Sequence, residues 1–319
     1  MKVKRNKKHL ALGLLVRDFL SEVPLKKLEI NPTQNRLSLS REYRTRWVET
    51  AQKILPTLDR AGIKYVLTKV YDVPKVKLED IDLLIEDKRE ASRAHNILRE
   101  ELYSLYKDRY SLNPLKVTAI QPENIIQVDI YPEATWFNMK YAPKSIITER
   151  RVRRRILGIN AYMPDPSCDA YIVASHSYNH GFVSLAEAAY FVRLVNEYHL
   201  DWNFLINISN DFRLNHALLI YLKLAKLSTN EDENEIQELI TRILQKDSLS
   251  RLYSAWFDKA AAHGFPLVLP LKLRLLTAFV RIFRVSSVHN FKGYDELIGY
   301  GLSLIFRGDR RELVKGNNS

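Results

Sequence analysis

A short segment that carries two aspartates, Glu79–Ile85, constrains the chain more than any other part of the sequence. Side chains alternate between the two faces of a strand, so Asp80 and Asp82 share one face about 7 Å apart. Two carboxylates at that distance repel each other unless a cation lies between them, and oxygen ligands favour a hard divalent ion. A third aspartate, Asp129, stands in a similar apolar segment over 125–131. The pattern predicts that the three aspartates hold one or two Mg²⁺ or Mn²⁺ ions.

The plainer interpretation of these aspartates is that they face solvent on half-exposed strands, as most Asp-x-Asp pairs do. Asp is disfavoured in strands, however, and here three of them occupy matching positions in strand-like segments. We therefore favour the metal site. Ions held in this way clamp a triphosphate for in-line transfer, which indicates phosphoryl or nucleotidyl transfer with a nucleoside triphosphate (NTP) as substrate.

The segments around the aspartates predict an α+β fold with a mixed sheet. Apolar positions recur at helical spacing in two segments and follow strand-like patterns in four others. We expect helices over 40–61 and 89–106 and strands over 64–70, 79–85, 115–120 and 125–131. Pro56 is expected to kink or end the first helix. The last two strands are joined by 121–124, whose length and residue types are typical of a hairpin.

The second half of the chain has helical patterns instead. Asp165 followed by Pro166 is typical of a helix start, and Ser184 three residues before Glu187 has capping-box spacing. Strand-like alternation is absent from 165–312, which predicts an all-helical C-terminal domain. We divide the chain into an N-terminal basic helical arm over 1–61, a sheet domain over 62–160 and a helical domain over 161–319.

The net charge of +12 is concentrated in the first half of the chain. Residues 1–167 hold 32 Lys and Arg against 21 Asp and Glu, whereas residues 168–319 hold 17 against 16. A basic surface attracts polyanions, so RNA or another polyanion is a candidate partner. Solvated charges on an ordinary basic protein explain the same balance equally well, because charge alone does not determine a partner.

The densest basic block puts five arginines into the six residues from Arg150 to Arg155. Guanidinium groups match phosphate geometry, and we assign Arg150, Arg151 and Arg153 to nucleotide binding on that ground. The alternative is a solvated helix start or loop whose charge is balanced by nearby acidic residues.

Taken together, these segments resemble the nucleotidyltransferase-fold superfamily, and in particular a largely uncharacterised nucleotidyltransferase family of bacteria and archaea. The likeness covers about 62–205, and its pieces are Tyr65-Val66-Leu67-Thr68-Lys69, Asp80-Ile81-Asp82-Leu83-Leu84-Ile85, Val128-Asp129-Ile130-Tyr131, Ala174-Ser175-His176-Ser177 and Leu200-Asp201-Trp202. The resemblance implies metal-dependent transfer of a nucleoside monophosphate from an NTP to an acceptor. It implies that Asp80, Asp82 and Asp129 are the catalytic metal ligands, and that Asp129 also activates the acceptor hydroxyl.

The chain departs from the family's pattern directly after its first strand. Active members usually carry a Gly-Ser or Gly-Gly pair there, whose backbone N–H groups cradle phosphate. Here the segment begins with Thr68 and Lys69, which we expect to contact the nucleotide, with Lys69 supplying a positive charge. A bulky segment approaches a triphosphate less closely than Gly does. Two alternatives therefore stay open: a catalytically inactive protein of this fold that binds nucleotide or RNA, and a helical partner-binding module with a vestigial sheet domain.

Two further features bear on location and on other metals. No apolar run reaches the length of a membrane span, so we expect no membrane association. The single cysteine, Cys168, excludes an internal disulfide and fits the reducing cytoplasm. His176 and His180 are four residues apart, but two histidines supply only half of a zinc site, and we expect them to pack.

Overall fold

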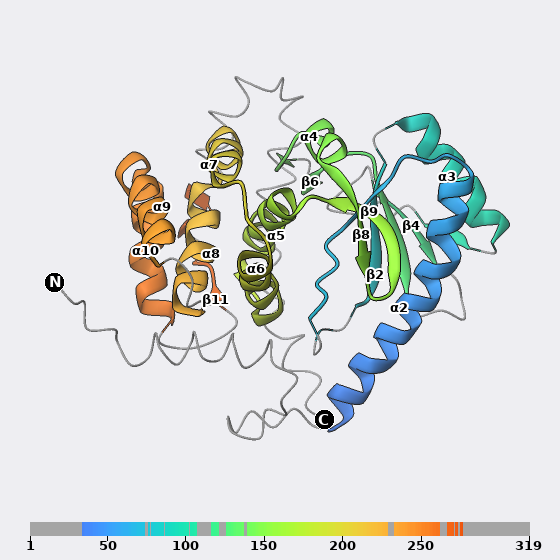
Figure 1. The fold of residues 1–319 in the computed structure, drawn as a ribbon, viewed down its shortest axis with the longest axis horizontal. Helices are drawn as coiled ribbons and strands as arrows, with labels where there is room; N and C mark the ends of the chain where they lie inside the picture. The colour runs from blue at the N-terminus through green and yellow to red at the C-terminus, as the bar shows by residue number, and fades with distance from the viewer. Residues whose placement is uncertain are drawn as a thin grey trace.

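The computed structural model places a mixed sheet with two helices on one side of the molecule and a group of helices on the other (Figure 1). It describes residues 34–73, 76, 78–85, 87–101, 103–106, 116–120, 126–136, 139–228, 233–261, 267–270, 272–273 and 275–276. The α+β fold predicted from the sequence is confirmed. Of the predicted N-terminal arm, only the part from residue 34 lies within the described residues, and the domain boundaries at 61 and 160 stay predictions.

The first described helix, α2 (Gln34–Arg60), ties the N-terminal part of the chain to the sheet. Pro56 lies inside it, and the helix continues for another turn to Arg60 instead of ending there. The buried stripe of α2 consists of Trp47, Ala51, Ile54, Leu55 and Leu58. The indole Nε1 of Trp47 donates a hydrogen bond of 2.8 Å to the main-chain carbonyl of Asp80. This contact fixes the helix against the strand that carries the first two aspartates.

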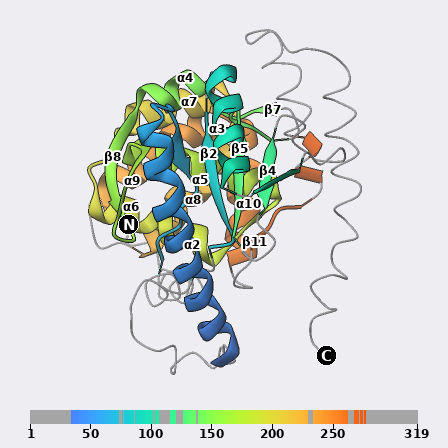
Figure 2. The ribbon, with the colours of Figure 1, turned by 90° about the vertical axis from the view of Figure 1, so that its right-hand side faces the viewer.

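Helix α3 (Lys88–Glu100) begins where Asp87 caps it, since the Asp87 carboxylate accepts hydrogen bonds from the main-chain N–H groups of Arg89 and Glu90. The predicted helix over 89–106 was too long. Its last residues form strand β3 (Ser104–Tyr106) instead. Leu105 continued the helical spacing of apolar residues by coincidence, and pairing with a neighbouring strand decides its conformation. Figure 2 looks onto α2 and α3 with the sheet behind them.

The central sheet has five strands in the order β1-β2-β5-β4-β3. The remaining strands are β1 (Val66–Thr68), β2 (Asp80–Leu84), β4 (Val117–Ile120) and β5 (Gln127–Tyr131). Strands β2 and β5 are parallel, and the other neighbouring pairs are antiparallel. The predicted hairpin is confirmed by the antiparallel register of β4 and β5.

A second hairpin contains the arginine-rich block, which the sequence pattern did not predict to be extended. Strands β8 (Arg151–Ile156) and β9 (Ile159–Pro164) pair antiparallel, and β9 lies alongside β1. Leu157 and Gly158 connect them with φ of 51° and 82°. Positive φ at both central residues is the geometry of a type I′ turn, which suits the twist of a hairpin. Before this hairpin come β6 (Thr135–Trp136), β7 (Met139–Lys140) and α4 (Lys144–Glu149).

The rest of the described chain is helical. Its helices are α5 (Pro166–His180), α6 (Leu185–Glu197), α7 (Trp202–Asp211), α8 (Asn215–Ser228), α9 (Glu233–Lys246) and α10 (Ser248–Ala260). The predicted start of α5 and the predicted capping box of α6 are both present. One departure from an all-helical domain is the pairing of β10 (Phe182–Val183) with β11 (Leu267–Val268), strands too short to show alternation.

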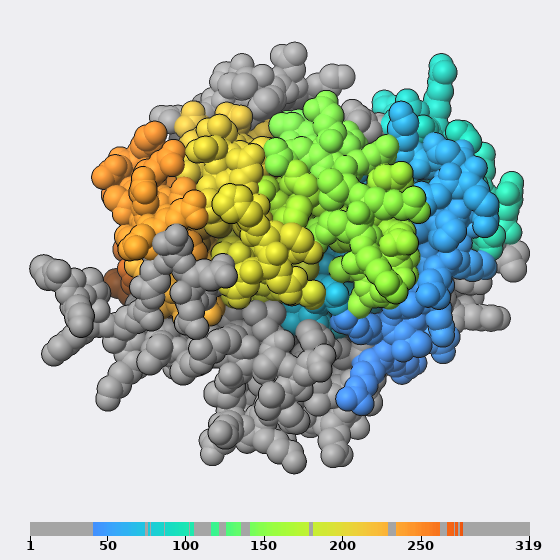
Figure 3. Space-filling model, in the orientation of Figure 1, coloured from blue at the N-terminus to red at the C-terminus, as the bar shows by residue number. Residues whose placement is uncertain are grey.

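Helix α8 is buried over most of its length and contacts α5, α6, α9 and α10. On the face shown in Figure 3, α2, the hairpin of β8 and β9, and the helices of the second half of the chain form one continuous surface. Among the described helices, none combines the length and the apolar character needed to span a bilayer.

Candidate functional site

The three predicted carboxylates meet at one point of the sheet. Asp80 and Asp82 lie on β2, and Asp129 lies on the parallel neighbour β5 directly opposite Asp82. One carboxylate oxygen from each lies within 4.8 Å of the other two. Within the described part of the chain, no other three His, Cys, Asp or Glu side chains come this close together. Asp129 and Asp82 are buried, whereas Asp80 is exposed, so the cluster opens to solvent on the Asp80 side.

Asp129 is held in place by groups on the neighbouring strand. The hydroxyl of Thr118 donates a hydrogen bond of 2.7 Å to Asp129 Oδ1, and the ammonium of Lys116 forms an ion pair with Oδ2. The Tyr131 hydroxyl lies 3.4 Å from Oδ2. Burial raises the pKa of Asp129, and the charge of Asp82 raises it further, against the opposing effects of Lys116 and Thr118.

Asp82 has its own cation. The ammonium of Lys69 lies 2.9 Å from Asp82 Oδ1, and the Lys69 side chain is only 10 % exposed. Burial acts to raise the pKa of Asp82, but the Lys69 ammonium more than offsets it and holds the pKa below its usual value. Burial likewise acts to lower the pKa of Lys69, and the carboxylate keeps it above its ordinary value. This pair is therefore an ammonium and a carboxylate at neutral pH.

Asp80 completes the cluster at its open side. Although the residue is exposed, protein surrounds its carboxyl closely, and the resulting desolvation together with the charge of Asp82 raises its pKa to about 7. A cation that reaches Asp80 would remove this repulsion.

The segment after β1 is clamped by two helices. Arg44 of α2 and Arg193 of α6 both form ion pairs with Asp72. Arg193 also donates a hydrogen bond to the main-chain carbonyl of Asp72, and Arg44 donates one of 3.3 Å to the carbonyl of Val73. Lys69, at the start of this segment, has a φ of 60°, which is uncommon for a residue with a side chain.

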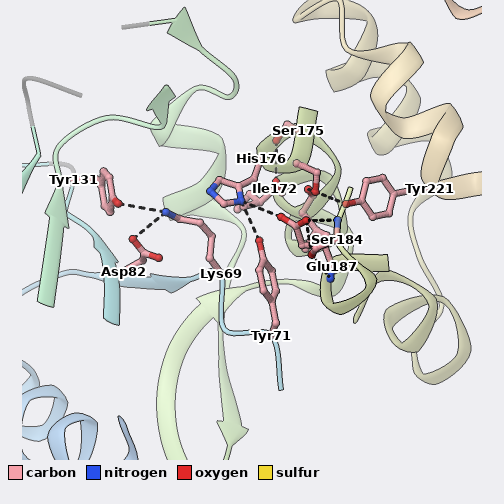
Figure 4. A network of polar contacts seen from close by, with 12 residues as sticks. Lys69, Tyr71, Asp82, Tyr131, Ile172, Ser175, His176, Ser184, Glu187 and Tyr221 are labelled. Carbon is pink, nitrogen blue, oxygen red and sulfur yellow. Dashed lines mark hydrogen bonds and ion pairs between the residues drawn. The ribbon is translucent and has the colours of Figure 1, made fainter. Parts of the chain in front are cut away.

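Tyr71 joins the same segment to the helical part of the molecule. Its hydroxyl lies 3.2 Å from Nδ1 of His176 on α5, and this nitrogen lies 3.4 Å from Glu187 Oε1 on α6. Figure 4 shows Lys69 directed to Asp82 on one side of the segment and Tyr71 directed to His176 on the other. His176 thus packs and hydrogen-bonds as expected, while the side chain of His180 lies outside the described residues.

The predicted nucleotide-binding residues fall into two groups. Thr68 ends β1 directly opposite Asp82, so Thr68 and Lys69 both belong to the carboxylate site. Arg150, in contrast, binds Asp165 through a hydrogen bond of 2.6 Å and lies over the Phe204 ring. Arg151 and Arg153 both lie over the ring of Tyr162 on β9. Among the described contacts, none joins these three arginines to the carboxylate cluster of Asp80, Asp82 and Asp129. Their role in nucleotide binding stays a prediction.

Sequence reasoning missed three residues of the site, namely Lys116, Thr118 and Tyr131. The predicted hairpin could have identified Thr118, because the pairing of β4 with β5 places Thr118 opposite Asp129. Both lysine ammonium groups lie over the Tyr131 ring, with Lys69 Nζ 4.5 Å and Lys116 Nζ 5.5 Å from its centroid.

The donor set fits a hard divalent cation. Carboxylate oxygens from rigid neighbouring strands are the ligands that Mg²⁺ and Mn²⁺ prefer, and Asp80 leaves a side open for phosphate oxygens and water. A mixed sheet that brings such a cluster together at its parallel strand pair defines an α+β protein of the nucleotidyltransferase type.

Comparison with known families agrees with this assignment. A family model described as an uncharacterised nucleotidyltransferase matches residues 16–230, and the chain belongs to this family. No curated protein and no solved structure matches the chain.

Proposed function

We propose that the chain is a metal-dependent nucleotidyltransferase that transfers a nucleoside monophosphate from an NTP to an acceptor. The observation that carries the proposal is the convergence of Asp80, Asp82 and Asp129, with one oxygen of each within 4.8 Å of the others. Membership of the family supports the class of reaction. The single buried Cys168 is consistent with a reducing cytoplasmic setting.

The roles of the site residues follow from their positions. Asp80, Asp82 and Asp129 hold Mg²⁺ or Mn²⁺, which when bound neutralises charge on the phosphates of the NTP. Asp129 is the candidate base for the acceptor hydroxyl, since burial raises its pKa toward the range in which a carboxylate accepts protons. Thr68 and Lys69 border the carboxylates and are the candidate phosphate contacts.

The test of this proposal is turnover of an NTP labelled at the α-phosphate. We expect label to move to protein, RNA or small-molecule acceptors only when Mg²⁺ or Mn²⁺ is present, with release of pyrophosphate. Calorimetric binding of NTP and metal without any turnover would contradict the enzymatic proposal.

A second candidate is a catalytically inactive member of the fold that binds nucleotide or RNA. One observation favours it: the ammonium of Lys69, in the segment where active members usually carry glycine, is bound to Asp82, a proposed metal ligand. Metal-independent nucleotide binding together with no label transfer is the result that this candidate predicts.

RNA or another polyanion is a proposed partner of the arginine hairpin. Arg150 binds Asp165 and Arg154 binds Asp169, so these two side chains already have acidic partners. Arg151, Arg153 and Arg155 alternate along β8 and therefore share one face of the strand. Together they offer a row of charges to a phosphate backbone.

We expect replacement of Arg151, Arg153 and Arg155 by Ser to weaken RNA binding and to flatten its salt dependence. Because the substitutions remove three charges that would neutralise phosphates, the slope of log affinity against log salt should fall by about 2 for a single strand. Fluorescence anisotropy with a labelled oligonucleotide across a salt series measures this slope. An unchanged slope would assign the three arginines to a solvated surface.

A further inference from the structure

We infer that the ammonium of Lys69 occupies the position of one of two divalent ions, so that the site binds a single metal ion together with its nucleotide. The inference rests on the proposed function, and it concerns how Asp82 is shared between metal and lysine. The two-ion arrangement is the general one for in-line transfer at clustered carboxylates. The structure gives three reasons to expect one ion in this chain.

The first reason is the contact itself. Asp82 is two residues from Asp80 on its own strand and lies opposite Asp129 on the neighbouring one, so it has both other carboxylates as neighbours. One of its oxygens, Oδ1, is 2.9 Å from Lys69 Nζ. An ammonium in that position already supplies to Asp82 the positive charge that a second ion would bring.

The second reason is that the ammonium is held on several sides. Lys69 Nζ lies 3.4 Å from the Tyr131 hydroxyl and 4.5 Å from the centre of the Tyr131 ring, whose face attracts a cation. The Lys69 side chain is 10 % exposed and that of Asp82 is 4 % exposed, whereas Lys116, which pairs with Asp129, is 25 % exposed and can turn to solvent when an ion binds. A buried lysine that left this position would carry its charge away from its counter-charge, which is costly.

The third reason is that the backbone around Lys69 is fixed from outside the sheet. The same short segment carries Asp72, which is bound by Arg44 and Arg193, and Tyr71, which is bound to His176 (Figure 4). These contacts come from α2, α5 and α6 and hold the segment in place. By holding this segment, α2, α5 and α6 position the Lys69 ammonium in the site.

The variant that tests the inference is Lys69→Met, which keeps much of the apolar stem and removes the charge. Mn²⁺ bound per chain is counted by electron paramagnetic resonance, with a saturating α,β-methylene NTP that cannot be cleaved. We expect about one Mn²⁺ per chain in the natural protein and about two in Lys69→Met, because the second ion can then replace the missing ammonium. Lys223→Met is the matched control, since Lys223 forms an ion pair with Asp258 in the helical part.

Thermal melts supply a second readout that does not depend on nucleotide. Without metal, Lys69→Met should melt at a lower temperature, because buried Asp82 loses its counter-charge. Mn²⁺ should then raise its melting temperature by more than it raises that of the natural protein or of Lys223→Met.

Each pattern of results decides one question. Two ions in the natural protein, or one ion in both proteins, would overturn the inference and leave the proposed function standing. No specific Mn²⁺ in either protein would overturn the proposed function as well. One ion in the natural protein and two in Lys69→Met, with the larger thermal shift in the variant, supports both.

Discussion

Asp129→Asn is expected to lower the rate of nucleotidyl transfer by about a thousandfold or more, which corresponds to about 4 kcal/mol of lost transition-state stabilisation. Asn has nearly the same shape and can still accept the hydrogen bond from Thr118. The Lys116 ammonium loses its ion pair, but its side chain is 25 % exposed and can turn to solvent, so the sheet should fold as before. What the substitution removes is a negative charge on the metal ion and the carboxylate proposed to take the acceptor's proton.

The rate is measured by transfer of the α-phosphate label, at saturating NTP and metal. Asp211→Asn is the control, because Asp211 is an exposed residue at the end of α7, far along the chain from the sheet. We expect the control to retain the natural rate. A loss of less than tenfold in Asp129→Asn would remove Asp129 from the catalytic site.

Arg154→Met is expected to lower the free energy of unfolding by about 3–5 kcal/mol near pH 8, because it leaves a buried carboxylate without its cation. Arg154 Nη1 lies 3.1 Å from Asp169 Oδ2, and the two side chains are 14 % and 1 % exposed. The Tyr190 hydroxyl donates a hydrogen bond of 2.7 Å to the same oxygen. Asp169 Oδ1 is buried and has no hydrogen-bond partner in the described part of the chain. The pair ties the arginine hairpin to α5 and α6.

The size of this effect should depend on pH in a defined direction. Burial raises the pKa of Asp169 even in the natural protein, while Arg154 opposes that rise. Without Arg154 the buried carboxyl binds a proton that the unfolded chain has already released. The free energy of unfolding of the variant, relative to the natural protein, should then fall by up to about 1.4 kcal/mol for each pH unit between the pKa of Asp169 in the natural protein and its higher pKa in the variant.

Urea unfolding at several pH values between 5 and 8 measures this difference. The control is Arg155→Met, the next residue on the same strand, whose side chain is exposed. It should change the free energy of unfolding by no more than about 0.5 kcal/mol at any pH. Equal effects of the two substitutions, or a pH-independent loss, would contradict the role given to the Arg154–Asp169 pair.

The grouping of the three aspartates was the part of this fold that the sequence predicted best. Strand alternation placed Asp80 and Asp82 on one face, and the repeated apolar context placed Asp129 on a second strand. The parallel pairing of the two strands then follows from topology, which brings Asp82 opposite Asp129. Local patterns sufficed here because each aspartate is fixed by the regular geometry of its own strand.

The surroundings of that site depend on contacts between distant segments, which local patterns do not contain. Lys69 looked like a free phosphate ligand, yet the structure pairs it with Asp82. The arginine block looked like a helix start or loop, because its apolar and charged residues alternate too weakly to indicate a strand. Pairing of β8 with β9 and the burial of Arg154 against Asp169 explain why it is extended. In each case an ion pair or a strand partner decides the outcome.

The most direct test of the central claim is a crystal structure of the protein soaked with Mn²⁺ and an α,β-methylene NTP, with anomalous diffraction used to locate the metal. We predict an anomalous peak bound by carboxylate oxygens of Asp80, Asp82 and Asp129 and by phosphate oxygens of the nucleotide. A nucleotide bound without any peak at these three residues, or Mn²⁺ bound only elsewhere, would contradict the claim that they form the metal site of a nucleotidyltransferase.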